Sequence, residues 1–296
     1  LKNTEGNRQQ YRELFLGTDG IEQYLSAVIL FTETMRQKND DGVLFPEALS
    51  GRGIVPGVKL DLGTEPMPGF PGEEITEGLD GLATRAEQYY AMGARFAKWR
   101  TVIHIKGDEL PTKEVIHTNA MIQARYARIV QEAGLVPIVE PEVLLSGEHS
   151  LARAEEVTTE VVDHTLYQCS RLRADLSALI LKTSMVVPGD ESGEEASPAE
   201  VADATARMLR AAVPEEVPGV VFLSGGQEPE EATKNLNAIA KKEPLPWEVA
   251  FSYARAIQGP ALEAWDGKKK NIEEARTVFL ERLTANVEAD QGEHAA

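Results

Sequence analysis

The sequence predicts an α/β fold of the TIM (β/α)8-barrel type. Short apolar runs that suit buried strands alternate with amphipathic stretches at helical spacing along the whole chain. Most of the candidate strands are apolar on both faces, which is typical of parallel strands covered by helices. Seven such strands follow one another in a single rhythm without a linker, so a closed barrel fits better than an open sheet. We therefore treat residues 1–296 as one barrel domain.

In the first half of the chain, helix-end signals define the elements. Thr4 suits the N-cap of a first helix, and Gly93 and Gly134 suit the residues that stop two later helices. The segment Leu62–Gly72 is rich in Gly and Pro, so we expect a loop there. The expected strands are 26–31, 53–61, 94–102 and 135–143, and the expected helices are 4–16, 79–92 and 112–132.

The second half shows a clear helix start at Ser197. Ser197 suits the N-cap, Pro198 the first helical position and Glu200 the third, which together form a capping box. The expected strands are 178–181, 217–223 and 247–252, and the expected helices are 151–172, one that begins at 198, 228–239 and 271–286.

The composition excludes several classes of protein. A net charge of −18 argues against nucleic acid and anionic membrane surfaces as partners. The sequence has no transmembrane-length apolar run, and its first residues do not resemble a signal peptide. The single cysteine, Cys169, rules out an internal disulfide and fits a reducing compartment, so we expect a cytoplasmic protein. None of the five histidines has H-x-H or H-x3-H spacing, so we expect no metal site.

The apolar run 178–181 ends in a charged residue, Lys182, before the chain leaves through Pro188-Gly189. A lysine at the end of a buried strand must be paired, solvated or chemically used. An amine that is removed from water loses its proton more easily, and the neutral amine is a nucleophile. Lys182 is therefore a candidate for a lysine that forms a Schiff base.

Other predicted strands also end in ionisable or glycine-rich residues. Side chains two residues apart on a strand point to the same face, and active sites of barrels lie at the carboxyl ends of the strands. The residues expected at this end are Lys59, Lys98, Arg100, Glu140, Glu142, Lys182, Arg255 and the turn Ser224-Gly225-Gly226.

These residue types suggest chemical roles around Lys182. A second lysine, for which Lys98 is the candidate, would disfavour protonation of the first. Glu140 and Glu142 could move protons while an imine forms. The backbone N–H groups of the Ser224-Gly225-Gly226 turn could bind a phosphate. Lys59, Arg100 and Arg255 would add cationic ligands, which implies a substrate with phosphate at one or both ends.

Each feature also has a purely structural interpretation. Lys182 could be an ordinary residue of the barrel rim, and the two glutamates could mark a solvated strand exit. The two glycines could form a plain turn. Lys98 and Arg100 could form salt bridges with Glu140 and Glu142 that only stabilise the fold.

Taken together, these stretches closely resemble class I fructose-bisphosphate aldolase, the Schiff-base type. The resemblance covers nearly the whole chain in order, so it is more specific than any single motif. The matching segments are GVKLD (57–61), RFAKWR (95–100), VPIVEPE (136–142), LILK followed by MVVPG (179–189), FLSGGQ (222–227), FSYAR (251–255), NLNAI (235–239) and AW-x-GKK (264–269).

The resemblance implies roles for individual residues. Lys182 matches the Schiff-base lysine, Glu140 the glutamate that moves protons, Glu142 a neighbour that tunes the lysine, and Lys98 a lysine active in C–C cleavage. The resemblance also implies two phosphate sites. The first consists of Ser224, Gly225, Gly226 and Arg255, with Ser252 and Ala254 beside them in the FSYAR segment. The second consists of Lys59 and Arg100, and Arg255 can swing between the two sites.

The resemblance also implies a homotetramer that needs neither metal nor cofactor, and it shows departures from the family pattern. The family's first barrel strand, with its catalytic aspartate, has no counterpart here, so the first strand is apparently absent. The long tail with a terminal tyrosine is missing too. We expect the sequence to be part of a longer protein, the alternative being a chain that has lost the strand. Thr183-Ser184 replaces Pro-Asn, and Ala254 replaces a glycine whose site the extra methyl could crowd.

The sequence thus predicts a lyase of glycolysis and gluconeogenesis that reversibly cleaves fructose 1,6-bisphosphate to dihydroxyacetone phosphate and glyceraldehyde 3-phosphate. Two alternatives stay open. One is a Schiff-base aldolase for another sugar phosphate. The other is a barrel with weakened catalysis that acts as a scaffold or binding protein, which the missing aspartate and tail would suggest.

Overall fold

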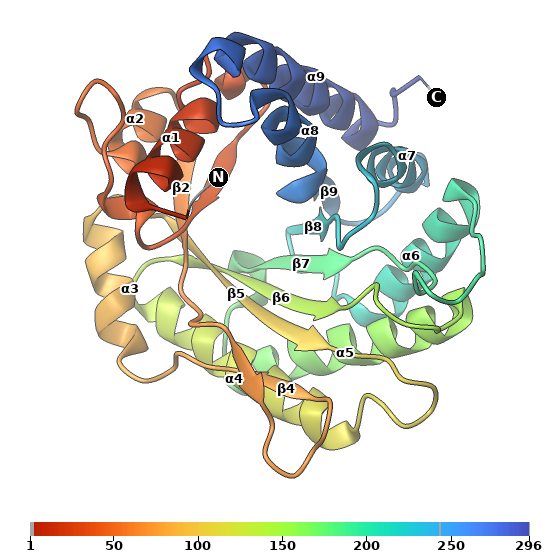
Figure 1. Ribbon diagram of the computed structural model, residues 1–296. Helices are drawn as coiled ribbons and strands as arrows, with labels where there is room; N and C mark the ends of the chain where they lie inside the picture. The colour runs from red at the N-terminus through yellow and green to blue at the C-terminus, as the bar shows by residue number, and fades with distance from the viewer. Residues whose placement is uncertain (1–2, 243, 296) are drawn as a thin grey trace.

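The computed structural model describes residues 3–242 and 244–295. Within these residues, the main sheet has seven parallel strands that curl around a common centre, with helices outside them (Figure 1). The predicted barrel-type fold and its seven strands are confirmed. In sheet order the strands are β1 (Ala27–Leu30), β2 (Val55–Lys59), β5 (Phe96–Ile103), β6 (Val136–Val143), β7 (Ile180–Ser184), β8 (Gly219–Leu223) and β9 (Glu248–Phe251).

All seven expected helices are present. The Thr4 cap is confirmed, and the Ser197 capping box forms with both of its reciprocal hydrogen bonds. The helices are α1 (Glu5–Leu16), α3 (Leu82–Ala91), α4 (Lys113–Glu132), α5 (Leu151–Arg171), α6 (Pro198–Ala212), α7 (Pro229–Ala240) and α9 (Ile272–Asp290). Short 3-10 turns cover Ile21–Gln23, Thr34–Arg36, Leu176–Ala178 and Lys269–Asn271.

Two helices were not predicted, α2 (Phe45–Gly51) and α8 (Arg255–Trp265). The first is too short to show a helical period. The second contains Gly259 and Pro260, both of which normally indicate the end of a helix. Burial of residues such as Ile257 and Ala261 against the rest of the protein outweighs these local signals.

The expectation of a loop over Leu62–Gly72 is wrong in part. β3 (Thr64–Pro66) and β4 (Glu74–Thr76) form a separate antiparallel ribbon, in which Thr64 faces Thr76. Strands of three residues are too short for an alternating pattern to show in the sequence. The start of β7 also differs from the prediction, because the Asp175 carboxylate accepts a hydrogen bond from the backbone N–H of Ser177 and caps a 3-10 turn there.

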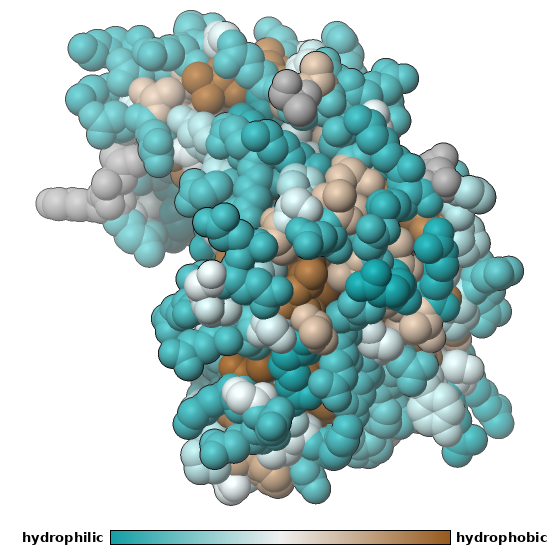
Figure 2. Space-filling view, turned by 90° about the vertical axis from the view of Figure 1, so that its right-hand side faces the viewer, coloured by the Kyte–Doolittle hydropathy of each residue, from teal (hydrophilic) through white to brown (hydrophobic). Residues whose placement is uncertain are grey.

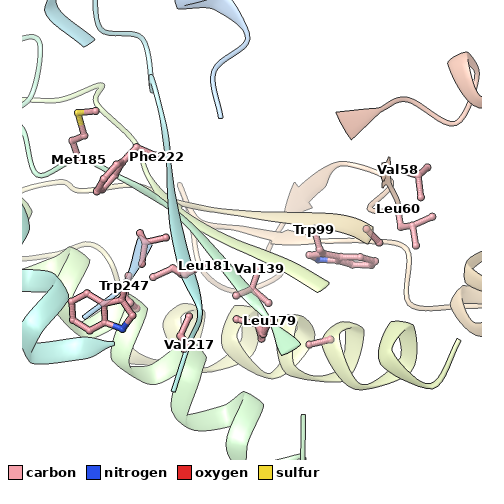
Figure 3. Packing of buried hydrophobic residues seen from close by; sticks show 14 of the residues in the cluster. Val58, Leu60, Trp99, Val139, Leu179, Leu181, Met185, Val217, Phe222 and Trp247 are labelled. Atoms are coloured by element: carbon pink, nitrogen blue, oxygen red, sulfur yellow. The ribbon is translucent and has the colours of Figure 1, made fainter. Parts of the chain in front are cut away.

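The strands pack their outward-facing side chains against the helices. Figure 3 shows Val139 and Leu181 among these buried residues, and Trp99 of β5 stacks on Tyr126 of α4 with ring centroids 5.2 Å apart. Because side chains alternate along a strand, the intervening residues Lys98 and Lys182 point to the inner side of the curled sheet. Outward packing therefore fixes which charged groups meet inside.

The helix layer spans the space between the two edge strands. β1 and β9 lie at the ends of the strand order, and no ladder joins them in the described part of the chain. Across this space α1 packs on α9, where the rings of Phe15 and Phe279 lie edge to face with centroids 4.8 Å apart. Figure 1 shows the two helices side by side. The first and last parts of the fold are thus joined by helix packing rather than by a strand ladder.

The Ser197 cap gives a first prediction. Ser197→Ala should lower the free energy of unfolding by about 1 kcal/mol, because it removes the hydroxyl that accepts the Glu200 N–H at 3.3 Å. Urea unfolding measures the change. The matched control is Ser170→Ala, at an exposed position inside α5, where a much smaller effect is expected. Equal losses in the two variants would contradict the role of the cap.

Candidate active site

Three charged side chains meet on the inner face of the sheet. The Lys182 ammonium lies 3.1 Å from Oε1 of Glu140, and the Lys98 ammonium lies 2.7 Å from the other oxygen, Oε2. The three residues come from adjacent strands, β5, β6 and β7, whose parallel register places them side by side. All three are buried, with at most 8 % of each residue exposed. One carboxylate is therefore shared between two buried amines.

This arrangement shifts the pKa values of both partners. Burial is the largest influence on Lys182; the charge of Lys98 acts in the same direction, and the net pKa lies below the ordinary value of 10.5 although Glu140 opposes the shift. Burial alone would raise the pKa of Glu140, but the charges of Lys182 and Lys98 outweigh it and the net pKa is lowered. The site thus favours an amine that loses its proton readily beside an ionised carboxylate.

Asp61 is a member of this cluster that the sequence analysis did not single out. Its carboxylate forms an ion pair with Lys59, lies 3.8 Å from the Lys98 ammonium and accepts the backbone N–H of Arg100 at 3.3 Å. The residue is only 6 % exposed. Its position two residues after Lys59, on the same face of an extended chain, was the signal that could have revealed it.

Arg100 and Glu142 form a second ion pair further along β5 and β6. The carboxylate is buried, whereas 37 % of the arginine side chain is exposed. Both ion pairs expected from the structural interpretation of these glutamates are therefore present. These ion pairs do not exclude a chemical role, because the positively charged groups of Lys98 and Arg100 still lie on the inner side of the sheet.

The Ser224-Gly225-Gly226 turn follows β8, and its two glycines allow the chain to change direction. Their φ angles of 62° and 106° lie in the left-handed region, and the second is essentially accessible only to glycine. The Gln227 N–H returns to the Ser224 carbonyl oxygen at 2.9 Å. A Cβ added at Gly226 would lie 3.7 Å from Nη2 of Arg255, so this guanidinium lies over the turn.

Arg255 is the first residue of α8, and Ala254 is its N-cap. Arg255 is exposed, and within the described residues its side chain has no hydrogen bond or ion pair. Ser252 precedes this helix and its N–H donates to the carbonyl oxygen of Phe222 on β8 at 2.8 Å. A helix N-terminus, a glycine turn and an unpaired arginine therefore converge here, and this combination suits an anion.

A pocket lies between this turn and the ends of β6 and β7. Ser184, Ser224 and Gln227 contribute polar groups to its lining, together with His149, whose buried Nδ1 has no partner among the described residues. The arrowheads of β5, β6 and β7 point to the right in Figure 1, so Figure 2 looks onto this end of the strands. Hydrophilic residues cover most of that face.

The structure brings the predicted residues together in two groups. Lys98, Glu140 and Lys182 form the buried centre, with Arg100 and Glu142 beside it on β5 and β6 and Lys59 on the neighbouring β2. Ser224, Gly225, Gly226, Ser252, Ala254 and Arg255 form the group at the ends of β8 and β9. Sequence reasoning missed Asp61, His149 and Gln227. The last two have no charge pattern that distinguishes them in the sequence.

The comparisons with known proteins agree with this arrangement. The family description "Glycolytic: Fructose-bisphosphate aldolase class-I" matches residues 1–296. A probable class 1 fructose-bisphosphate aldolase of Xylella fastidiosa is 47% identical over 287 residues, which are 97% of this chain and 86% of that protein. The chain belongs to the class I fructose-bisphosphate aldolase family.

Further relatives come from Arabidopsis thaliana and Plasmodium falciparum. The cytosolic aldolase 4 of Arabidopsis thaliana is 47% identical over 99% of this chain and 74% of that protein. An aldolase of Plasmodium falciparum, solved in complex with TRAP and a small-molecule inhibitor, superimposes with a TM-score of 0.98 at 45% identity, covering 100% of this chain and 86% of that one. The recognised family and the barrel fold are therefore confirmed, and the enzyme class is that of a lyase.

No helix in residues 3–242 and 244–295 has the length and apolar character that a membrane span requires. No group of three or more His, Cys, Asp or Glu side chains in these residues is arranged to hold a metal ion.

Proposed function

We propose that this aldolase cleaves fructose 1,6-bisphosphate reversibly into dihydroxyacetone phosphate and glyceraldehyde 3-phosphate through an imine on Lys182. The observation that carries the proposal is the buried Lys182 amine, with its lowered pKa, 3.1 Å from a carboxylate that can exchange protons with it. No cofactor is needed in this scheme, because the protonated imine formed on Lys182 is the electron sink.

The steps follow from the positions of the two groups. The neutral Lys182 amine attacks the C2 ketone, and one nitrogen proton passes through Glu140 to the new alkoxide. A second proton, taken up from solvent through Glu140 and returned when the imine is later hydrolysed, lets the hydroxyl leave as water and gives the protonated imine. The C3–C4 bond then breaks, its electrons move into the protonated imine, and Glu140 accepts the proton of the C4 hydroxyl. Return of that proton to C3 of the enamine and hydrolysis of the imine release the second product and regenerate Lys182.

Lys98 and Glu142 support this centre in different ways. Lys98 holds Glu140 at 2.7 Å and its charge lowers the pKa of Lys182. Glu142 holds Arg100 on the adjacent strand, and its charge acts on the lysine in the opposite sense. We infer that the opposing charges of Lys98 and Glu142 help to set the pKa of Lys182, and thus how readily its amine becomes neutral.

The cationic groups support a substrate with two phosphates. Ser224, Gly225, Gly226 and Arg255, with Ser252 and Ala254 alongside, would bind the phosphate at C1. Lys59 and Arg100, on the strands at the other side of Lys182, would bind the phosphate at C6. An aldolase for a sugar with one phosphate would need only one of these groups. Steady-state kinetics with fructose 1-phosphate and fructose 1,6-bisphosphate distinguish the two.

Borohydride trapping tests the proposal directly. Incubation with dihydroxyacetone phosphate and reduction should leave one stable amine adduct, which peptide mass mapping places on Lys182. An adduct on another lysine, or no adduct with protein that cleaves the bisphosphate, would contradict the mechanism. No adduct and no turnover would instead support the scaffold interpretation.

The pH dependence of trapping provides a further prediction. Because the pKa of Lys182 is lowered by burial and by Lys98, the trapping rate should reach half of its maximum below pH 10.5, the ordinary lysine value. Lys98→Met should move this midpoint to higher pH, since it removes a like charge and leaves Glu140 to Lys182 alone. Lys59→Met is the matched control, and an equal shift in that variant would contradict the role of Lys98.

We also infer a cytoplasmic homotetramer, on the basis of family resemblance. Cytosolic plant relatives support the location, although a chloroplastic relative from Arabidopsis thaliana is also 47% identical. Sedimentation equilibrium on the purified protein tests the subunit number, and a monomer at micromolar concentration would contradict it.

A further inference from the structure

A pair of histidines lies on two helices outside the strands that carry the Lys182 centre. His117 on α4 and His164 on α5 approach each other with Nδ1 and Nε2 3.1 Å apart. They are 47 residues apart in the sequence, so no spacing rule could reveal them. The imidazole rings are 5.4 Å apart between centroids and inclined by 60°. Both nitrogens face each other across two packed helices.

The separation of these nitrogens suits a shared metal ion. Imidazole nitrogens bind zinc at about 2.0–2.1 Å, so two such ligands are about 2.8–3.0 Å apart at a right angle and about 3.3–3.4 Å apart at the tetrahedral angle. The observed 3.1 Å lies between these values. Turning each ring so that its lone pair points to one ion would replace the present contact.

The surroundings also suit a cation. Glu160 lies one helical turn before His164 and forms an ion pair with Lys113 through one oxygen. Glu160 and Asp163 act on His164 as negative charges, whereas Lys113 acts as a positive one. The two carboxylates outnumber the single ammonium, so the local charge favours binding of a divalent ion. His117 is exposed and His164 is partly exposed, which leaves room for water as further ligands.

Gln168 could complete the set of protein ligands. Its Nε2 lies 3.4 Å from Nε2 of His164, one turn further along α5. Oxygen and nitrogen of a side-chain amide exchange places by rotation of the terminal torsion. That rotation would present an oxygen to an ion held by the two histidines.

We propose that His117 and His164 bind one transition-metal ion of the borderline class, such as Zn²⁺, Ni²⁺ or Cu²⁺, and that the ion links α4 to α5. The set of two imidazoles without a third histidine or a cysteine predicts an affinity order with Cu²⁺ first. Mg²⁺ prefers oxygen ligands and should not bind here. The ion would stabilise the helix layer and take no part in the chemistry at Lys182.

Titration calorimetry on tag-free protein freed of metal by a chelator tests the site. Ni²⁺ should bind with one equivalent per chain, and either His117→Gln or His164→Gln should weaken binding by about tenfold or more, since losing a ligand costs at least as much as losing its supporting partner. Saturating Ni²⁺ should also raise the unfolding temperature of the wild type and not that of the double variant.

His104→Gln and His294→Gln are the matched controls. Each removes a histidine that is paired with a carboxylate, Glu74 or Glu288, and that makes no hydrogen bond to His117 or His164 within the described residues. Both controls should bind Ni²⁺ like the wild type. The proposal fails if either control loses the binding, or if both variants of the pair keep it. The unfolding temperatures of all metal-free variants are compared first, so that a folding defect is not mistaken for loss of a ligand.

Discussion

Lys182→Met is expected to abolish both turnover and borohydride trapping. The whole chemical step passes through the Lys182 nitrogen, and enzymes of this kind accelerate reactions by about 10⁶-fold or more, so we expect kcat to fall by at least about 10⁴-fold. The fold should persist, because methionine is apolar and similar in length, and because Glu140 keeps Lys98 as a partner at 2.7 Å. A coupled assay of triose phosphate release measures the loss.

Lys182→Arg separates charge from nucleophilicity. Arginine keeps a positive charge beside Glu140, but its pKa is so high that it supplies no neutral amine. We therefore expect this variant to be as inactive as Lys182→Met while it preserves the ion pair. Appreciable turnover in either variant would overturn the assignment of Lys182.

Glu140→Gln is expected to have the second largest effect. Loss of a positioned general acid and base typically costs about 10²–10⁴-fold in rate. Because the residue is only 3 % exposed and lies between two buried amines, its neutralisation should also lower the free energy of unfolding by about 3–5 kcal/mol. The adduct on Lys182 should still form in trapping experiments, but more slowly than in the wild type.

Glu142→Gln is the control for this prediction. Its partner Arg100 is exposed over 37 % of its side chain, so solvent can compensate part of the lost charge. We expect a smaller loss of stability and a smaller decrease in kcat than in Glu140→Gln. If the two variants showed equal rates of trapping and turnover, the proton-transfer role of Glu140 would be wrong.

The sequence was informative where one local pattern determines the outcome. Alternation along a strand predicted that Lys98 shares a face with Arg100 and that Glu140 shares one with Glu142, and the capping box predicted the start of α6 at Pro198. Both depend on residues close together in the chain. The barrel class followed from the order of strands and helices along the chain, which can be read without knowledge of long-range contacts.

Features that depend on tertiary packing could not be predicted in this way. α8 forms although it contains Gly259 and Pro260, because residues such as Ile257 and Ala261 are buried. Asp61 becomes part of the site only when β2 and β5 pair. The contact between His117 and His164 requires α4 and α5 to lie side by side, and the sequence of either helix alone does not predict this.

The packing of α1 on α9 has a consequence for the order of folding. Next to this contact, the Tyr11 hydroxyl of α1 donates a hydrogen bond to the side-chain oxygen of Gln258 on α8. These two residues are 247 positions apart in the sequence. Contacts between such distant residues require closure of a very long loop and form slowly. During synthesis α1 leaves the ribosome long before α8 and α9. Phe15 therefore cannot pack against Phe279 until the last part of the chain has been made. The joining of the two ends is therefore expected to be a late step, and pulse-labelling hydrogen exchange should show α1 protected after the central strands.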